Sequence, residues 1–206
     1  MRKLRTAILI SGRGSNMMAL VAAARAAEYP AEIVCVVANT ADAKGLEFAA
    51  ASGIATMVID HKAFPSREAF EAALDAYLRS MNVEAIALAG FMRVLTAGFI
   101  AGWDGRMINI HPSLLPAYKG LHTHERAIAD GAKVHGCSVH LVTPELDGGP
   151  VLLQAEVPVL PEDTAEVPVV AGDTADVLAA RVLTEEHRIY PQALALLSHR
   201  IIAETP

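Results

Sequence analysis

The sequence predicts a single domain of the α/β class, Rossmann-like, with a mostly parallel twisted sheet and helices on both faces. Two observations predict this fold. Short runs of β-branched and other apolar residues alternate with Ala-rich stretches through the first half of the chain, which is the pattern of parallel strands joined by helices. The chain has 206 residues, 53% of them apolar, enough for one core of ordinary size. We therefore treat residues 1–206 as one domain.

The first half should hold alternating strands and helices. The expected strands are residues 5–10, 32–38, 55–59, 85–89 and 106–110, and the expected helices are 16–27, 43–51, 66–81 and 96–101. The third helix follows the start signal Pro65-Ser66 and carries Phe70, Leu74 and Leu78 at helical spacing, so it should lie across the sheet. Core packing explains these side chains better than a cofactor site does.

Past residue 110 the pattern changes. A Pro-rich segment, 111–120, precedes a helix near 125–129 and two strands, 138–142 and 151–157. The long loop between those strands, 143–150, is of the kind that binds a ligand or closes over one. The chain finishes with an amphipathic helix near 175–197, which we expect to be broken or bent at Pro191.

One short repeat interrupts this order. The sequence AEVPV at 155–159 recurs at 165–169, and each copy is followed by Asp-Thr. Two copies of ten residues cannot form a solenoid. A tandem duplication that lengthens one connection is the simplest account, because longer surface loops cost little free energy.

Composition excludes several classes of function. A formal net charge of −6 with scattered Lys and Arg argues against a nucleic-acid partner. Apolar runs are too short for a signal peptide or a membrane span. Cys35 and Cys137 lie in apolar strand-like runs without metal-type spacing, so we expect buried free thiols and a cytoplasmic protein.

A glycine-containing loop, SGRGSN at residues 11–16, joins the first strand to the first helix. Glycines let the backbone approach an anion, and a helix N-terminus presents free N–H groups to it. A dinucleotide site is excluded, since Met17 follows where the third glycine of that fingerprint is needed and the second strand ends at Asn39 rather than at an acid. The loop suits a monophosphate, although glycines here could also serve only a tight turn.

Three polar residues form a candidate catalytic set. Asn109 and His111 lie two apart at a strand end, so their side chains point to the same side, at the edge where α/β sheets bind ligands. An amide and an imidazole can polarise a carbonyl and stabilise an oxyanion, as acyl transfer requires. Asp147 could orient the imidazole or accept a proton. No Ser or Cys stands in a nucleophile motif, so a substrate amine would attack directly.

Each of these residues also has a structural interpretation. Asn109 could cap a strand, His111 could be a core histidine and Asp147 a turn former, and the residues alone favour these readings narrowly. His122 and His124 do not converge on a metal at a spacing of two. His135 and His140 have no spaced partners that would predict a role.

Four segments together resemble one family. They are ISGRGSN at 10–16, LAGFMR at 88–93, INIHPSLLP at 108–116 and ELDGGPV at 145–151. In this order they are similar to the folate-dependent phosphoribosylglycinamide formyltransferase family, over about residues 5–195. The resemblance favours the catalytic reading and implies a formyltransferase fold with a C-terminal antiparallel strand portion. It also implies phosphoribosyl binding by about residues 1–100 and folate binding and catalysis by about 101–206.

The resemblance implies two small-molecule substrates, glycinamide ribonucleotide and 10-formyltetrahydrofolate, and no metal. Residues that would bind the ribonucleotide are Gly14, Ser15, Asn16 and Glu186. Residues that would bind the folate are Arg67, Met92, Arg93, Val94, Leu95, Asn109, Thr143, Pro144, Glu145, Leu146 and Asp147. By the same similarity Asn109 and protonated His111 would stabilise the oxyanion, and Asp147 would tune His111 and relay a proton.

Alternatives stay open. The catalytic domain that formylates methionyl-tRNA resembles the chain around Asn109, His111 and Asp147, but it does not need the phosphate loop. A 10-formyltetrahydrofolate hydrolase and a non-catalytic phosphosugar-binding module are further candidates. The repeat departs from the family pattern and puts in doubt the strand pairing between residues 153 and 173. We expect a monomer or a homodimer, without nucleic acid or membrane partners.

Overall fold

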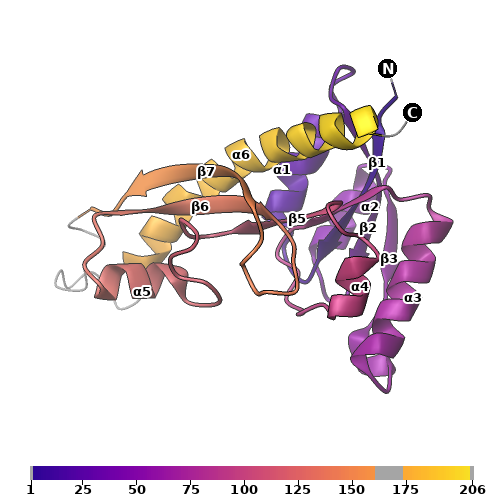
Figure 1. Ribbon diagram of the computed structural model, residues 1–206, viewed down its shortest axis with the longest axis horizontal. Coiled ribbons are helices and arrows are strands. Elements are labelled where there is room, and N and C mark those ends of the chain that lie inside the picture. The colour runs from indigo at the N-terminus through magenta and orange to yellow at the C-terminus, as the bar shows by residue number, and fades with distance from the viewer. Residues whose placement is uncertain (1, 161–173, 205–206) are drawn as a thin grey trace.

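A computed structural model describes residues 2–160 and 174–204. In this part of the chain one seven-stranded sheet has the order β3-β2-β1-β4-β5-β6-β7. Strands β1 to β5 pair in parallel, whereas β6 and β7 are antiparallel. The strands are β1 Leu4–Ile10, β2 Ala31–Ala38, β3 Ala55–Val58, β4 Ala85–Leu88, β5 Met107–His111, β6 Val134–Leu141 and β7 Val151–Pro158. The predicted fold class is confirmed, with its antiparallel C-terminal strands (Figure 1).

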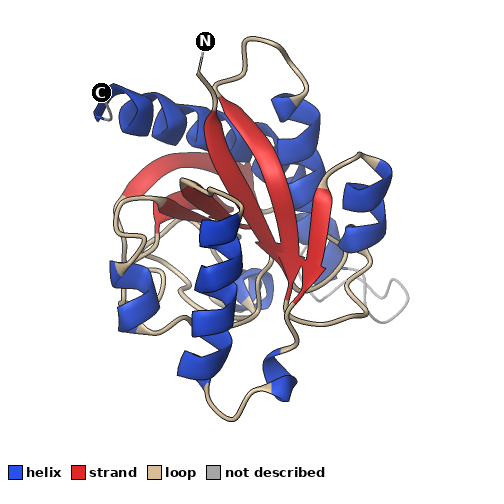
Figure 2. Cartoon of the chain, turned by 90° about the vertical axis from the view of Figure 1, so that its right-hand side faces the viewer, coloured by secondary structure: helices blue, strands red, loops and turns tan. Residues whose placement is uncertain are grey.

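Helices cover both faces of the sheet, as predicted (Figure 2). They are α1 Ser15–Ala24, α2 Gly45–Ala51, α3 Arg67–Ser80, α4 Ala97–Ala101, α5 Thr123–Ala129 and α6 Thr174–Glu204, with a short 3-10 helix at His61–Ala63 that the sequence pattern did not indicate. One core cluster joins α1 and α6 to the sheet, and the other joins α3 and α4 to its opposite face. Alternate side chains of β1 enter the two clusters, so this central strand is apolar on both faces.

Helix α3 forms where its start signal predicts. The Ser66 hydroxyl caps it by accepting a hydrogen bond from Ala69 N at 3.2 Å. Phe70, Leu74 and Leu78 are buried against the sheet. The stripe is therefore core packing, as expected from its spacing.

Of the break or bend expected at Pro191, the break is wrong, because α6 is one continuous helix from Thr174 to Glu204. A proline inside a helix costs about 3 kcal/mol. Tyr190 and Leu194, on either side of it, are fully buried in the core, and each such side chain contributes about 1.5–3 kcal/mol. Tyr29 also donates its hydroxyl to the Pro191 carbonyl at 2.7 Å. Packing on the sheet thus outweighs the local cost.

Strand β6 begins at Val134, four residues before the expected start. Gly136 hid this extension, since glycine weakens a strand pattern. A Cβ at Gly136 would lie 2.0 Å from the Ala155 carbonyl oxygen, so β7 approaches too closely for any other residue. The first copy of the AEVPV repeat belongs partly to β7, which pairs with β6 as far as Pro158. The second copy lies outside the described residues.

Cys35 and Cys137 are free and buried. Burial raises the pKa of the Cys35 thiol to about 11 and that of Cys137 to about 12. Both side chains therefore act as small apolar core residues, as the sequence predicts.

Candidate active site

Two neighbouring cavities open at the carboxyl ends of the strands. The larger, about 660 Å³, is lined by Ile100 and by residues from the segments 88–95, 109–112, 120–125 and 140–147. The smaller, about 250 Å³, is lined by residues 11–16 together with Ala89, Gly90 and Met92. Gly90 and Met92 line both cavities. This is the place where the strand order reverses between β1 and β4, and where open α/β sheets bind ligands.

The structure brings the predicted catalytic set together in the larger cavity. Asn109 and His111 lie on β5, and Asp147 lies on the loop between β6 and β7. His111 Nδ1 is 3.5 Å from Asp147 Oδ2, and both side chains are about 7% exposed. The other ring nitrogen, His111 Nε2, lies 3.0 Å from the Tyr118 carbonyl oxygen. Both nitrogens therefore face acceptors, an arrangement in which a protonated ring can donate twice.

Asp147 is held as an anion. Burial on its own would raise the pKa of Asp147, but the neighbouring polar groups of His140 and Gly120 and the charge of His111 lower it below the ordinary value. Gly120 N donates to Asp147 Oδ2 at 2.9 Å. Such hydrogen bonds favour the ionised form of a carboxyl group. The carboxylate beside His111 is thus suited to orient the ring and to accept a proton.

The loop that carries Asp147 is fixed by close packing on β6. Asp147 has a φ of 49°, a left-handed conformation that Asp tolerates better than most residues. Two positions later, a Cβ at Gly149 would lie 1.8 Å from the Leu141 carbonyl oxygen. Leu141 N in turn donates to the Pro150 carbonyl at 2.9 Å. This close approach therefore requires a glycine at position 149.

His140 is a site residue that sequence reasoning missed. Its Nε2 lies 3.2 Å from Asn109 Nδ2 and 3.6 Å from Asp147 Oδ1. The register of β5 and β6 places His140 directly opposite Asn109. A register between antiparallel strands is not readable from residue spacing in either strand, so only the strand pairing could have revealed this contact.

The predicted phosphate loop lines the smaller cavity. Gly14 has a φ of 73° and caps α1, so Ser15 and Asn16 begin the helix and present their backbone N–H groups. A Cβ at Gly14 would meet Met17 Cε at 2.8 Å. Arg13 also lines this cavity and supplies a positive charge there.

Glu186 reaches the same loop from α6. Asn16 Nδ2 donates to Glu186 Oε2 at 2.6 Å, while Asn16 Oδ1 is buried without a hydrogen-bond partner. Burial raises the pKa of Glu186, and the Asn16 hydrogen bond partly offsets this. The structure thus connects Glu186 to the loop 11–16 through its hydrogen bond with Asn16.

The segment 92–95 forms one wall of the larger cavity. Thr96 anchors it, because its backbone N and its hydroxyl both donate to the buried carboxylate of Glu71, the former at 2.7 Å. Arg93 lines the cavity and Leu95 is buried. Four apolar side chains around the cavity are 57–70% exposed: Met92, Val94, Leu121 and Leu146. The cavity therefore offers apolar surface to a ligand beside the polar side chains of Asn109, His111 and Asp147.

Of the remaining predicted folate residues, three line the larger cavity and one does not. Thr143, Pro144 and Glu145 line the larger cavity, and Glu145 forms an ion pair with Lys119 at 2.7 Å. Arg67 is the exposed first residue of α3 and is not among the residues that line either cavity.

Residues 2–160 and 174–204 contain no group of three or more His, Cys, Asp or Glu side chains that could hold a metal ion. In the same part of the chain no helix is both long enough and apolar enough to cross a membrane.

Comparison with known proteins gives one consistent family. The sequence pattern of the formyl transferase family matches residues 4–167. The chain is 46% identical to phosphoribosylglycinamide formyltransferase of Escherichia coli K12, over 91% of this chain and 84% of that protein. It is 43% identical to the human trifunctional purine biosynthetic protein adenosine-3, over 96% of this chain. The chain spans only 14–18% of the length of such trifunctional relatives.

Solved structures agree with the sequence comparison. The crystal structure of phosphoribosylglycinamide formyltransferase from Brucella melitensis has a TM-score of 0.86 and 52% identity, and the match covers 96% of each chain. Glycinamide ribonucleotide transformylase 1 from Symbiobacterium toebii has a TM-score of 0.87 and 42% identity, with 96% of this chain and 88% of that chain covered.

Proposed function

The chain belongs to the formyl transferase family, and from this premise we propose that it transfers the formyl group of 10-formyltetrahydrofolate to the amine of glycinamide ribonucleotide. The product would be the formylated ribonucleotide, a step of purine synthesis. One observation carries the proposal: a phosphate-type loop and a catalytic Asn, His and Asp set line two cavities that share a wall.

The smaller cavity would hold the phosphoribosyl end of the ribonucleotide. Gly14, Ser15 and Asn16 would bind it through the helix N-terminus, and Glu186 would accept from its hydroxyl groups. Support comes from the unpartnered, buried Oδ1 of Asn16, an acceptor that a ligand hydroxyl can satisfy. This assignment keeps most of the phosphoribosyl site within residues 1–100, with Glu186 as the contribution from the second half.

The larger cavity would hold the folate, which has a flat apolar body. Met92, Val94 and Leu146 supply exposed apolar surface for it, and we retain Arg93, Leu95, Asn109 and the segment 143–147 as contacts. Arg67, although outside the cavity lining, is retained as a contact for a portion of the folate that extends beyond the cavity. Most of this site, and the catalytic set, comes from residues 101–206.

In the proposed reaction the amine nitrogen attacks the formyl carbon and forms a tetrahedral intermediate. Asn109 and protonated His111 donate to its oxyanion, so His111 Nε2 exchanges the Tyr118 carbonyl for the substrate oxygen. The bond between the formyl carbon and folate N10 then breaks, and a proton passes from the former amine to N10. Asp147, ionised and beside His111, would accept that proton in transit. Oxyanion donors of this kind typically contribute about two to three orders of magnitude to the rate.

The test is the absorbance change as 10-formyltetrahydrofolate loses its formyl group, measured with and without glycinamide ribonucleotide. Turnover that requires the ribonucleotide would support the proposal, whereas equal turnover without it would identify a hydrolase. The Asn109→Ala variant should lose about 10²- to 10³-fold in kcat. His199→Ala, in an exposed position far along α6, serves as the control and should keep native turnover. Near-native turnover of folded Asn109→Ala would overturn the assigned mechanism.

A further inference from the structure

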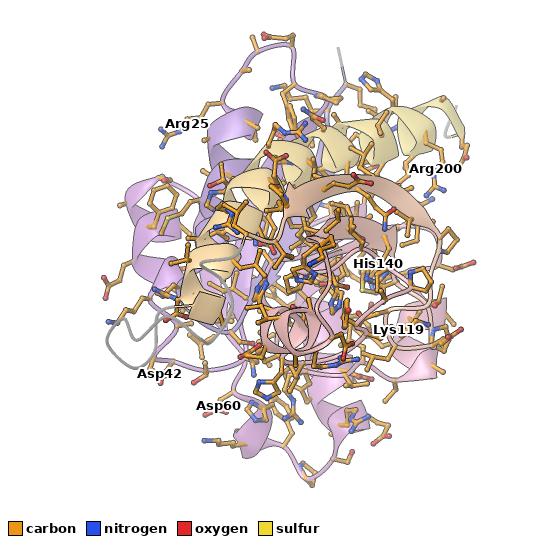
Figure 3. All side chains as sticks on the ribbon, turned by 90° about the vertical axis from the view of Figure 1, so that its left-hand side faces the viewer. Arg25, Asp42, Asp60, Lys119, His140 and Arg200 are labelled. Carbon is orange, nitrogen blue, oxygen red and sulfur yellow. The ribbon has the colours of Figure 1, made fainter. Side chains whose placement is uncertain are left out.

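His140 occupies a position from which it can act on Asn109. It lies on β6 opposite Asn109 on the neighbouring strand, is 2% exposed and lines the larger cavity. In Figure 3 its label lies near the middle of the view, among overlapping side chains, whereas Arg25 and Arg200 project at the periphery. A buried imidazole needs a partner for each ring nitrogen, and the partners here determine which nitrogen carries the proton.

The backbone fixes one of the two nitrogens as a donor. His140 Nδ1 lies 2.9 Å from the carbonyl oxygen of Leu141, which can only accept, so Nδ1 carries a proton. A neutral ring then has only a lone pair at Nε2. The group that faces Nε2 at 3.2 Å is the amide of Asn109, and this amide must therefore turn its Nδ2, not its Oδ1, toward the ring.

The orientation of this amide matters for the reaction. With one Nδ2–H given to His140, the second Nδ2–H is left for the cavity that Asn109 lines. An amide turned the other way would place its acceptor oxygen where the donor is needed, and an acceptor repels an oxyanion. Nothing else at Asn109 chooses between the two orientations among the contacts of the described residues, since His140 is the side chain that bonds this amide.

Asp147 is the competing partner of the same nitrogen. Its Oδ1 lies 3.6 Å from His140 Nε2, farther than the Asn109 amide. A proton on Nε2 would make His140 a donor to Asp147 and would drive the amide of Asn109 to turn. In the first arrangement His140 Nε2 accepts a hydrogen bond from Asn109, and in the second it donates one to Asp147. An experiment can therefore distinguish them.

We propose that His140 is a positioning residue: its Nε2 lone pair holds the Asn109 amide with a donor toward the reacting carbonyl. The inference rests on the proposed function, because it assigns His140 a role in the same formyl transfer. His140 itself does not touch the reacting atoms and acts through Asn109.

The experiment is a double-mutant cycle with His140→Leu and Asn109→Ala, assayed by folate absorbance. His140→Leu should lower kcat about 10- to 100-fold, less than loss of the donor itself, with little change in either KM. In the Asn109→Ala background the same substitution should cost no more than about twofold. His140→Gln, which keeps an acceptor at the ring position, should recover part of the loss. The proposal would be overturned if the kcat losses of His140→Leu and Asn109→Ala multiplied in the double variant. It would also be overturned if His140→Leu were coupled to Asp147→Asn instead of to Asn109→Ala.

A spectroscopic measurement covers the case in which His140→Leu fails to fold. The ring nitrogens of ¹⁵N-His-labelled native protein, assigned with His140→Gln, should show that the neutral ring of His140 carries its proton on Nδ1 and leaves Nε2 bare. A proton on Nε2 would overturn the proposal whether or not the protein is active. Absence of turnover in the native protein would instead refute the proposed function, so the two failures are distinguishable.

Discussion

Gly149→Ala tests whether the loop that carries Asp147 must lie where the structure places it. The new Cβ would lie 1.8 Å from the Leu141 carbonyl oxygen, and real Cβ atoms stay at least 3.0 Å from such neighbours. Backbone must therefore move by about 1.2 Å. Because Leu141 O also accepts from His140 Nδ1, this movement disturbs His140 as well as Asp147. A displacement of about 1 Å at a catalytic group costs about a hundredfold in rate.

The neighbouring glycine provides a matched control. The three atoms nearest to a Cβ at Gly148 all belong to the side chain of Glu145, the closest being Cδ at 2.4 Å, and that exposed side chain can swing away by releasing its ion pair with Lys119. Exposed changes of this kind cost within about 0.5 kcal/mol, roughly twofold. We therefore expect Gly148→Ala to keep most of the native kcat, whereas Gly149→Ala loses about two orders of magnitude.

The assay is folate absorbance with the ribonucleotide present, and urea unfolding of the same samples reports whether each variant is folded. Gly149→Ala should still unfold cooperatively, since the loop lies at the edge of the core. If a folded Gly149→Ala protein kept kcat within about threefold of native, a 1 Å shift would not matter. The contact between the loop and β6 would then not position the catalytic set.

Three further changes address other parts of the site. Because folding lowers the pKa of Asp147, its ionised form stabilises the fold above about pH 4 and this contribution disappears as the pH falls through the folded pKa. Urea titrations should show Asp147→Asn less stable than native at pH 7, with a smaller difference at pH 3. Burial raises the pKa of Glu186, so Glu186→Gln should raise the Tm at pH 7, where the charge is unfavourable, while increasing the KM for the ribonucleotide; an unchanged KM would contradict its assigned contact. Tyr190 donates to the Leu88 carbonyl at 2.8 Å from a fully buried position, so Tyr190→Phe should lower the free energy of unfolding by about 1–2 kcal/mol, measured in urea.

The sequence predicts the fold because the local patterns and the packing agree. In α3 the Ser66 start signal and the spacing of Phe70, Leu74 and Leu78 indicate the same helix that the structure contains. The disagreement at Pro191 has the opposite origin. There a strong local signal for a break is outweighed by burial of Tyr190 and Leu194, which sequence pattern cannot weigh because the partners lie on distant strands.

The candidate site likewise contains some residues that the sequence could predict and others that it could not. Asn109 and His111 are two residues apart on one strand, so their common side follows from the period of a strand. Asp147 and His140 reach them from other segments, across a strand register and a tightly packed loop. Spacing could suggest Asp147 as a candidate, and the resemblance gave it a role, but His140 became visible only when β6 was paired with β5.

Ser11 connects the two cavities. Its hydroxyl accepts from Met92 N at 2.8 Å and donates to Asn39 Oδ1 at 2.6 Å. One end of β1 is thereby tied both to the wall of the larger cavity and to the end of β2. The reaction we propose needs an amine from one cavity and a formyl carbon from the other within about 3–3.5 Å. The two hydrogen bonds of Ser11 therefore help to fix the distance between the cavities at the ends of β1 and β2.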